Sequence, residues 1–479
     1  MRVLFISVNK EKSFRPALPI GMAIVATATR RRNQQIYCLD LCFEEDDDKA
    51  ISEVIDRFRP DAIGISLRNV DSQVYLEPFY YPPLLKKTVI CCREKSPNSK
   101  MVLGGSGFSL IPEELMCYTK ADFGIVGPGE ISFPTLIERL ANEEDFSDIP
   151  GLVYTQEDGR LVLNKPAYSL QLDTESVVDR SLYDGKYYLY NFNTVDSTMK
   201  TFESVQTKRG CMLKCIYCCN HRLEGDNIVL RNPQKVVDEF ESIKDSNLAS
   251  GIEFVDGVFN LPYDHALAVV KEMNKRGINF SWTCTINPSI VTKELVYYMK
   301  KTGCYSVEFG TDSCSNTILK HLNKNYSVAD VIRSHNLFDH YGIRVLHCMI
   351  IGSPGETKET VIKTMEIMEE LAPNNKKHNV FFNLGCRIYK GTRLYEIALD
   401  EDVIKKEDNM ITPRFYIAPS IVNDDIILKT IEDWIVTHKN WYLWWGIPNF
   451  SLRERIEQVS KEYKDIEKLF NEKELGAEL

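Results

Sequence analysis

The N-terminal part of the chain alternates short apolar runs with segments of helical periodicity. Residues 2–7 (RVLFIS) form a continuous apolar run, as buried parallel strands do. Strands that alternate with helices predict a parallel, doubly wound sheet, which binds ligands at the carboxyl ends of its strands. We expect strands at 2–7, 36–41, 62–66, 101–105 and 123–127, and helices at 21–32, 49–58, 82–95 and 130–141.

A second series of strands and helices begins at Phe202 and runs to about Tyr395. Six βα repeats of this size predict a partial or full parallel barrel, whose chemistry belongs at the carboxyl ends of its strands. The connector before it contains a predicted hairpin at 152–164 and a Tyr-rich stretch at 183–190. The expected barrel strands are 202–207, 251–256, 279–284, 304–309, 343–351 and 379–389.

The predicted fold class is therefore α/β, with a Rossmann-like N-terminal domain, a partial (βα)6 barrel and a mostly helical C-terminal cap. The C-terminal segment holds four of the 5 tryptophans, including those in NWYLWWGIP (440–448). These rings either fill gaps where the cap packs on the barrel, or form an exposed surface for an apolar or lipid-like substrate. The predicted limits are 1–145, 146–200 (connector), 201–398 and 399–479.

Composition narrows the function. The 479 residues carry a formal net charge of −10 without a dominant basic stripe, so we expect no nucleic-acid partner. No run of about 18 apolar residues predicts a transmembrane segment, and the apolar part of the N-terminus is too short for a signal peptide. We expect a cytoplasmic protein whose 14 cysteines are thiols or metal ligands.

One group of cysteines stands apart from the others. Cys211, Cys215 and Cys218 form a C-x3-C-x2-C pattern in TKRGCMLKCIYCCNHR (207–222). Three closely spaced thiolates can ligate three irons of a [4Fe–4S] cubane, which leaves the fourth iron open to chelation by S-adenosylmethionine. A zinc site is the weaker alternative, because it favours a second C-x2-C pair elsewhere in the chain. We expect Cys219 to be a bystander.

Two glycine-rich loops follow neighbouring strands of the N-terminal sheet. Glycine lets a backbone approach a large ligand closely, but it also suits a tight strand-to-helix turn. Two such loops side by side favour a ligand modestly, and their spacing is not GxGxxG, so no nicotinamide cofactor is indicated. The loops are Gly104-Gly105-Ser106-Gly107 and Gly127-Pro128-Gly129-Glu130.

The cysteine pattern with Tyr217 before its last cysteine resembles the radical S-adenosylmethionine superfamily. The resemblance implies that the backbone of Tyr217 contacts the adenine, and that Glu308 and Asp312 face the ribose or carboxylate. IIGSPGE (350–356) resembles the fifth-strand motif, which places the backbone of Ile351 beside the adenine. The Gly-Gly-Glu motif that receives the methionine amine is absent, and Asp256 stands where a polar group is needed. Asp312 could instead cap the helix that follows it.

A doubly wound domain before such a barrel resembles the cobalamin-dependent branch of the superfamily. LPIGMA (18–23), ISLRNVD (65–71), VLGGSGFS (102–109) and IVGPGE (125–130) carry this resemblance. No Asp-x-His motif is present to ligate cobalt, and Arg68 or Asn69 could lie beneath the corrin, where a cation disfavours an axial ligand. For Arg68, a surface salt bridge is an equal alternative. The implied cobalamin-binding residues are Arg68, Asn69, Asp71, Gly104, Gly105, Ser106, Gly107, Gly127, Gly129 and Glu130.

The resemblance implies a methyltransferase that acts on an unactivated carbon through methylcobalamin and a 5′-deoxyadenosyl radical. It implies three cofactors, namely the [4Fe–4S] cluster, S-adenosylmethionine and cobalamin, and an external electron donor of flavodoxin or ferredoxin type. The substrate is expected to be a small or lipid-like molecule. The alternatives are a cyclase or rearrangement enzyme, a non-catalytic cobalamin-binding sensor, and a radical enzyme whose N-terminal domain binds no cofactor. A methylthiotransferase fits less well, since no further cluster cysteines or basic tail are evident.

Overall fold

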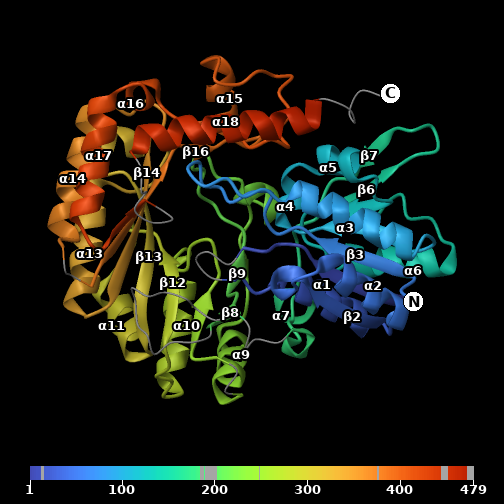
Figure 1. The fold of residues 1–479 in the computed structure, drawn as a ribbon. Coiled ribbons are helices and arrows are strands. Elements are labelled where there is room, and N and C mark those ends of the chain that lie inside the picture. Colours follow the sequence, from blue (N-terminus) through green and yellow to red (C-terminus); the bar gives the residue numbers. More distant parts are fainter. Residues whose placement is uncertain are drawn as a thin grey trace.

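The structure is a computed structural model in which two mainly parallel sheets lie beside one another, each flanked by helices (Figure 1). It describes residues 1–11, 16–183, 188, 202–246, 249–374, 377–443 and 451–471. Among these residues, no helix combines the length and the apolar character needed to cross a membrane. The expected Tyr-rich stretch falls largely outside the described residues, as do Trp444 and Trp445 of the Trp-rich segment.

The N-terminal sheet has the strand order β2-β1-β3-β4-β5-β6-β7. Its first five strands pair in parallel, as predicted, and the connector hairpin extends the sheet through antiparallel pairing of β6 with β5. The connector therefore belongs in part to this sheet, because β5 would otherwise expose an unpaired edge. The strands are β1 (Arg2–Ser7), β2 (Gln35–Asp40), β3 (Ala62–Ser66), β4 (Lys100–Gly104), β5 (Phe123–Ile125), β6 (Leu152–Thr155) and β7 (Leu161–Leu163).

Helices cover both faces of this sheet, so the side chains of β1 are buried on both sides. Val3 and Phe5 pack with α1 and α6, whereas Leu4 and Ile6 pack with α2, α3 and α5 on the opposite face. The chain crosses from one face to the other beside β1, so the carboxyl ends of β1 and β3 form the topological switch point. The helices are α1 (Ile20–Arg31), α2 (Asp47–Phe58), α3 (Pro82–Lys95), α4 (Ser106–Leu110), α5 (Pro112–Thr119) and α6 (Ser132–Asn142).

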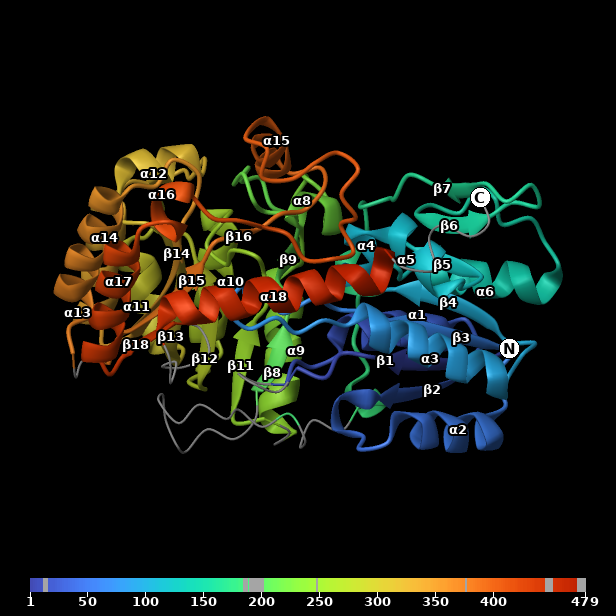
Figure 2. The ribbon, with the colours of Figure 1, turned by 45° about the horizontal axis from the view of Figure 1, so that its top comes forward.

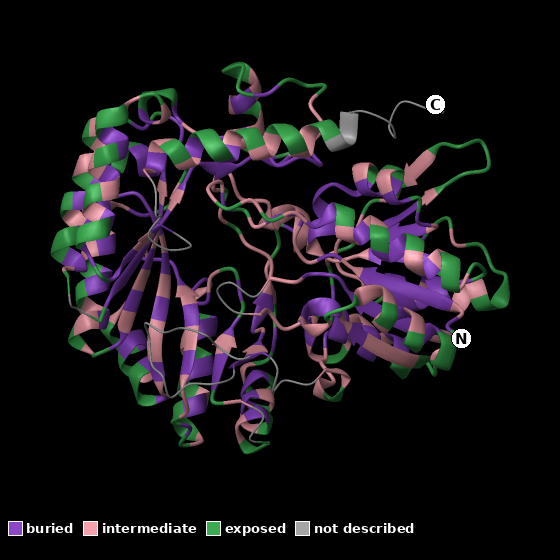
Figure 3. Ribbon diagram, in the orientation of Figure 1, coloured by how far each residue is buried: buried purple, intermediate pink, exposed green. Residues whose placement is uncertain are grey.

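The second sheet is an open parallel barrel with the order β18-β15-β14-β13-β12-β11-β8. Buried and half-buried positions alternate along β14, so one face packs on the outer helices and the other lines the concave side (Figure 3). The strands are β8 (Phe202–Val205), β11 (Gly251–Phe254), β12 (Trp282–Ile286), β13 (Cys304–Asp312), β14 (Arg344–Ile351), β15 (Asn379–Leu384) and β18 (Trp441–Leu443). The outer helices are α9 (Pro233–Asp245), α10 (Tyr263–Lys275), α11 (Lys293–Lys301), α13 (Val328–His340), α14 (Lys358–Leu371) and α17 (Asp425–Thr437).

The predicted six strands are present, but the C-terminal segment adds a seventh. β18 pairs in parallel with β15, so this segment is not only a helical cap. Trp441 of β18 is 1% exposed and donates from Nε1 to Ala372 O at 2.9 Å, which makes it a packing residue. The remaining short elements are α7 (Leu172–Glu175), β9 (Lys208–Arg209), α8 (Asn220–Leu223), β10 (Val229–Leu230), α12 (Asn316–His321), β16 (Cys386–Arg387), α15 (Arg393–Asp400), β17 (Phe415–Tyr416) and α16 (Pro419–Val422).

Helix α18 (Leu452–Asn471) runs from the barrel across to the N-terminal domain (Figures 1 and 2). Tyr75, in the loop after β3, hydrogen-bonds Ser460 at 3.0 Å and stacks on Tyr463 with ring centroids 5.7 Å apart. Arg455 donates to Leu76 O at 2.7 Å. The helix thus holds the two domains together and fixes the geometry of the space between them.

Candidate functional site

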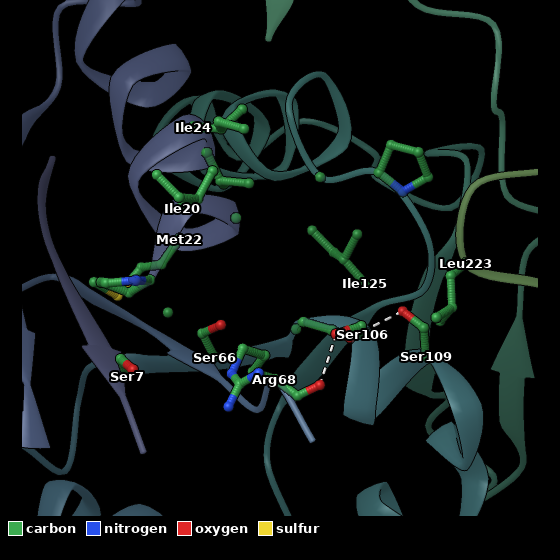
Figure 4. Close-up of a pocket in the computed structure, with 18 of the residues that line it drawn as sticks. Ser7, Ile20, Met22, Ile24, Ser66, Arg68, Ser106, Ser109, Ile125 and Leu223 are labelled. Carbon is green, nitrogen blue, oxygen red and sulfur yellow. Dashed lines mark hydrogen bonds between the residues drawn. The ribbon is translucent and has the colours of Figure 1, made fainter. Parts of the chain in front are cut away.

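A cavity of about 430 Å³ opens at the carboxyl ends of the N-terminal strands. Ile20 and Ile24 of α1 form one wall, and Ser66, Arg68 and Ser106 lie on the opposite side (Figure 4). The cavity is at the switch point of the sheet, where doubly wound folds bind large cofactors. Residues of the barrel complete its lining, namely Gln206, Arg209, Asn220, Leu223, Glu224 and Val255.

The first glycine loop contains two glycines that its tight turn requires and one that leaves room for a ligand. Gly105 has a φ of +96°, and a Cβ there would lie 2.4 Å from Leu67 O, so this glycine is required by the chain's own packing. Gly107 is required in the same way, because its Cβ would lie 2.8 Å from the carbonyl carbon of Asn69. A Cβ at Gly104 would meet nothing within 4 Å, and this residue lines the cavity. Gly104 is therefore the position that leaves room for a ligand.

The second glycine loop lines the same cavity, and Gly127 N–H donates to Ser109 Oγ of α4 at 3.0 Å. Gly127 has a φ of +79°, and a Cβ there would lie 3.2 Å from Pro166. Gly129 approaches Val25 of α1, with 3.1 Å between its ideal Cβ and Val25 Cγ2. Both glycines line the cavity, so a larger side chain at either position would alter its shape as well as the loop.

The loop after β3 is held by Asn9. Asn9 Oδ1 accepts from the backbone N–H groups of Arg68 (2.6 Å) and Asn69 (3.4 Å), and Asn9 Nδ2 donates to Asn69 O. Ser106 Oγ donates to Arg68 O at 2.6 Å. These bonds fix the backbone, and the half-buried Arg68 side chain lines the cavity. That Arg68 faces cobalamin stays a prediction.

Two acidic residues predicted to bind cobalamin form ion pairs with residues of the barrel. Asp71 Oδ2 accepts from Arg387 Nε at 2.8 Å, and both side chains are buried. Glu130 pairs with Arg209 at 2.5 Å and accepts from Ser176 at 2.9 Å. The carboxylate of Asp71 is thus bound by a barrel residue, whereas Glu130 still lines the cavity. Local sequence patterns do not reveal such pairs, since the partner lies in another domain.

The cysteines lie in the loop of residues 210–219, between the hairpin strand β9 and helix α8. Burial raises the pKa of Cys215, and it raises the pKa of Cys218 to about 12, with the neighbouring thiols adding to the effect. Buried thiols favour the thiolate only when positive charge is supplied nearby, which the irons of a cluster would do. The three cysteines therefore fit a [4Fe–4S] cluster. The described residues contain no group of three or more His, Cys, Asp or Glu side chains placed around a single metal ion.

The expected site residue Tyr217 is fixed by a buried ion pair. Tyr217 donates from its hydroxyl to Asp312 Oδ2 at 2.6 Å, and Lys324 Nζ lies 2.7 Å from the same oxygen. Burial alone would lower the pKa of Lys324, but Asp312 and Tyr217 outweigh it and hold that pKa well above its ordinary value. Asp312 does not cap helix α12, whose N-cap is Ser315. It sits at an irregular register of β13 with a φ of +58°, which turns it toward the cysteine loop.

Asp256 is fully engaged with the chain. Its Oδ1 accepts from the backbone of Thr207 (2.7 Å) and Lys208 (3.2 Å), and its Oδ2 accepts from Thr207 Oγ1 (2.6 Å) and Lys208 Nζ (3.1 Å). The carboxylate therefore anchors the strand that leads into the cysteine loop. These four hydrogen bonds occupy the carboxylate, whereas the family resemblance needs a polar group here to receive the methionine amine. That role of Asp256 stays a prediction.

The other expected barrel residues lie on β13 and β14. Glu308 is at a half-buried position on the concave side and hydrogen-bonds Cys348, whose pKa is raised by burial and then by this carboxylate. Ile351 ends β14, and its carbonyl accepts from Gly385 N–H at 2.6 Å. Glu308 therefore borders the concave face of the barrel, whereas the side chain of Ile351 is buried in the hydrophobic core. Lys324, Arg209 and Glu224 also surround the cysteine loop, but no spacing in the sequence singles them out.

Comparison with known proteins agrees with this geometry. The model of the B12 binding domain matches residues 7–137, and the model of the radical SAM superfamily matches residues 205–368. An uncharacterised methyltransferase of Pyrococcus horikoshii is 26% identical over 81% of this chain and 79% of its own length. Tryptophan 2-C-methyltransferase of Streptomyces laurentii is 24% identical over 80% of this chain and 72% of its own length.

A solved structure shows the same fold. The radical S-adenosylmethionine methyltransferase TsrM of Kitasatospora setae, with cobalamin and a [4Fe–4S] cluster bound, is 20% identical. The superposition covers 97% of this chain and 99% of TsrM with a TM-score of 0.77. The order of the two matched domains and the cavity that both of them line lead to one conclusion: the chain belongs to the cobalamin-dependent radical S-adenosylmethionine enzymes.

Proposed function

We propose that the chain is a methyltransferase that adds a methyl group to an unactivated carbon of a small molecule. The observation that carries this proposal is the cavity lined by both domains. Its N-terminal wall holds Arg68 and Gly104, and its barrel wall includes Asn220 and Leu223 of α8, the helix that directly follows the cysteine loop. Cofactors held at these two walls would share one space, which a transfer between them requires.

The chain's own residues bind and position the reacting groups. When bound, cobalamin supplies a carrier for the methyl group, and the cluster with S-adenosylmethionine supplies a carbon radical. Cys211, Cys215 and Cys218 would hold the cluster, and Tyr217 with Asp312 would keep their loop in place. The apolar side chains of α1 exclude water from the cobalamin side of the cavity.

The proposal also includes a first candidate substrate and an electron donor. Tryptophan is the first substrate to test, since one relative is named for it. A flavodoxin or ferredoxin would deliver electrons to the cluster. None of the 14 cysteines forms a disulfide, which suits the reducing cytoplasm in which such donors occur.

Anaerobic reconstitution tests the proposal. The protein is loaded with iron, sulfide and hydroxocobalamin, desalted, and assayed for retained cobalamin. It is then incubated with reductant, candidate substrate and S-adenosylmethionine carrying a deuterated methyl group. About one cobalamin per chain and a product heavier by the labelled methyl support the proposal. Bound cobalamin with 5′-deoxyadenosine formation and a converted but unmethylated product would instead identify a rearrangement enzyme.

A further inference from the structure

Two helix ends contact the cysteine loop directly. In the turn that follows α12, Asn323 Nδ2 donates to Lys214 O at 2.6 Å. In the first turn of α15, Leu394 N–H donates to Ile216 O at 2.9 Å. The loop therefore lies between the C-terminal end of α12 and the N-terminal end of α15. In Figure 2, both helices and α8 lie at the upper side of the molecule.

Each of these helix ends carries an exposed cation. The carbonyl of Lys320 accepts from Asn323 N–H at 3.0 Å, so Lys320 belongs to the same turn as the loop contact. Arg393 begins α15 and directly precedes Leu394. Both side chains are exposed, and neither has an ion-pair partner among the residues that the structure describes. The helix dipole disfavours a cation at the first position of α15, so the stability of this helix does not explain Arg393.

The cysteine loop adds an apolar centre to these charges. Met212 directly follows Cys211 and is 58% exposed, although its side chain is large and apolar. Arg222 of α8 adds a third cation at the start of α15, because a Cβ on Gly391 would lie 3.5 Å from Arg222 Cδ. An exposed methionine is thus accompanied by cations from three elements around the loop.

The acidic groups nearby do not cancel this positive charge. Asp226 pairs with Lys214 of the loop, and Glu114 pairs with Lys390 just before α15, so these pairs are neutral. Glu396 is the acid in the first turn of α15 and opposes one further cation. The three cations described above outnumber it, so the surface around Met212 is positive.

A positive surface with an apolar centre suits an acidic protein partner. The whole chain has a net charge of −10, and flavodoxins are acidic, so the two proteins repel each other at long range. A local positive patch overcomes this repulsion at one place and orients the partner there. The exposed methionine supplies apolar contact area at the centre of such an interface. Because Met212 follows Cys211, a partner docked here lies beside the loop that would hold the cluster.

We propose that the surface formed by Met212, Arg222, Lys320 and Arg393 is the docking site of an acidic electron donor of the flavodoxin type. One electron leaves the flavin of the donor and enters the cluster, and no atom is transferred. The inference rests on the proposed function in its need for a cluster and an external donor. It does not depend on the substrate or on methyl transfer.

Stopped-flow reduction of the reconstituted cluster by a fully reduced, acidic flavodoxin tests the proposal. The double variant Lys320→Glu/Arg393→Glu should lower the second-order rate constant roughly tenfold or more at low ionic strength, and added salt should shrink this difference. Lys301→Glu reverses an exposed charge at the end of α11, beside the amino ends of the barrel strands, and should leave the rate constant unchanged. Met212→Gln should slow reduction at every salt concentration, because it removes apolar contact area.

Photoreduced deazariboflavin serves as a small reductant that needs no docking surface. It should reduce the cluster of the parent and of the double variant at the same rate, with equal iron content in both proteins. Reduction of the double variant by flavodoxin at the parent rate overturns the proposal, and so does an equal slowing with deazariboflavin. A parent chain that assembles no cluster would instead overturn the cluster assignment, whereas absence of methylated product would affect neither result.

Discussion

Glu130 and Arg209 form an ion pair between the two domains, with 2.5 Å between Oε1 and Nη1. The side chain of Glu130 is 3% exposed and that of Arg209 is 12% exposed, so the pair is largely desolvated. Arg209 ends β9, two residues before Cys211, and Glu130 belongs to the second glycine loop. The pair therefore couples the position of the cysteine loop to the wall of the cavity.

Breaking this pair should destabilise the protein. Glu130→Gln leaves Arg209 buried without its counter-charge, and removal of one partner of a buried pair typically costs about 3–5 kcal/mol. Denaturant unfolding measures the loss. Glu138→Gln is the matched control, because Glu138 pairs with Arg32 on the surface and such pairs contribute about 0–1 kcal/mol. Equal effects of the two substitutions would contradict the interdomain role.

Arg68 should affect the redox chemistry of bound cobalamin. Its side chain lines the cavity, and a nearby cation stabilises the lower oxidation states of cobalt. Arg68→Gln should retain cobalamin but lower the Co(II)/Co(I) midpoint potential, measured by spectroelectrochemistry. Arg32→Gln, on the surface, should leave it unchanged. A potential that is insensitive to Arg68 would place this residue away from cobalt.

Cys219 should be dispensable for the cluster. Its pKa is raised by burial, and it lies at the N-cap of α8, close enough to Arg222 and Arg387 to feel their charges. Cys219→Ala should keep the iron and sulfide content of the parent, whereas Cys218→Ala should lose most of both. Loss of iron from Cys219→Ala, equal to that from Cys218→Ala, would show that the ligand set is wrong.

Glu356 should make stability depend on pH. Burial raises its pKa to about 7, although the backbone N–H groups of Gly352 and Ser353 oppose the shift. Because this pKa is higher in the folded protein, folding takes up a proton between pH 4.5 and 7. The free energy of unfolding therefore falls as the pH rises through this window, and the loss of stability is complete above pH 7. The free energy of unfolding of Glu356→Gln should therefore rise relative to that of the parent between pH 5 and pH 8, by roughly 3 kcal/mol at most.

Unfolding midpoints at pH 5 and pH 8 measure this gain. Glu366→Gln, on the exposed side of α14, should give the same difference from the parent at both values. A Glu356→Gln profile that runs parallel to that of the parent would mean that Glu356 titrates normally in the folded protein.

Much of the fold is predictable because buried parallel strands are simple apolar runs. Strand β3 and helix α3 have the bounds that the sequence predicts. Helix α4 is not predicted, because the glycines of 104–107 suggest a plain turn, and the short helix α5 is not predicted either. Strand β18 is not predicted either, since three residues beside a Trp-rich stretch carry no clear period.

Some features of the candidate site are predictable from the sequence, and others depend on tertiary contacts. The cysteine pattern is local and specific, so the sequence identifies it directly. The partners of Asp71 and Asp256 are set by tertiary contacts, and their engagement with Arg387 and Lys208 could not be read from spacing. Lys324 has no motif around it, and its ion pair with Asp312 beside Tyr217 is set by tertiary contacts.

The pairing of β18 with β15 has a consequence for biosynthesis. The N-terminal sheet and its hairpin are complete once residue 163 has left the ribosome, so this domain can fold while the rest is still being translated. The barrel cannot cover the outer edge of β15 until residue 443 has emerged. Until then that edge offers unpaired backbone groups to other chains, so the nascent barrel stays open to edge-to-edge aggregation up to this point.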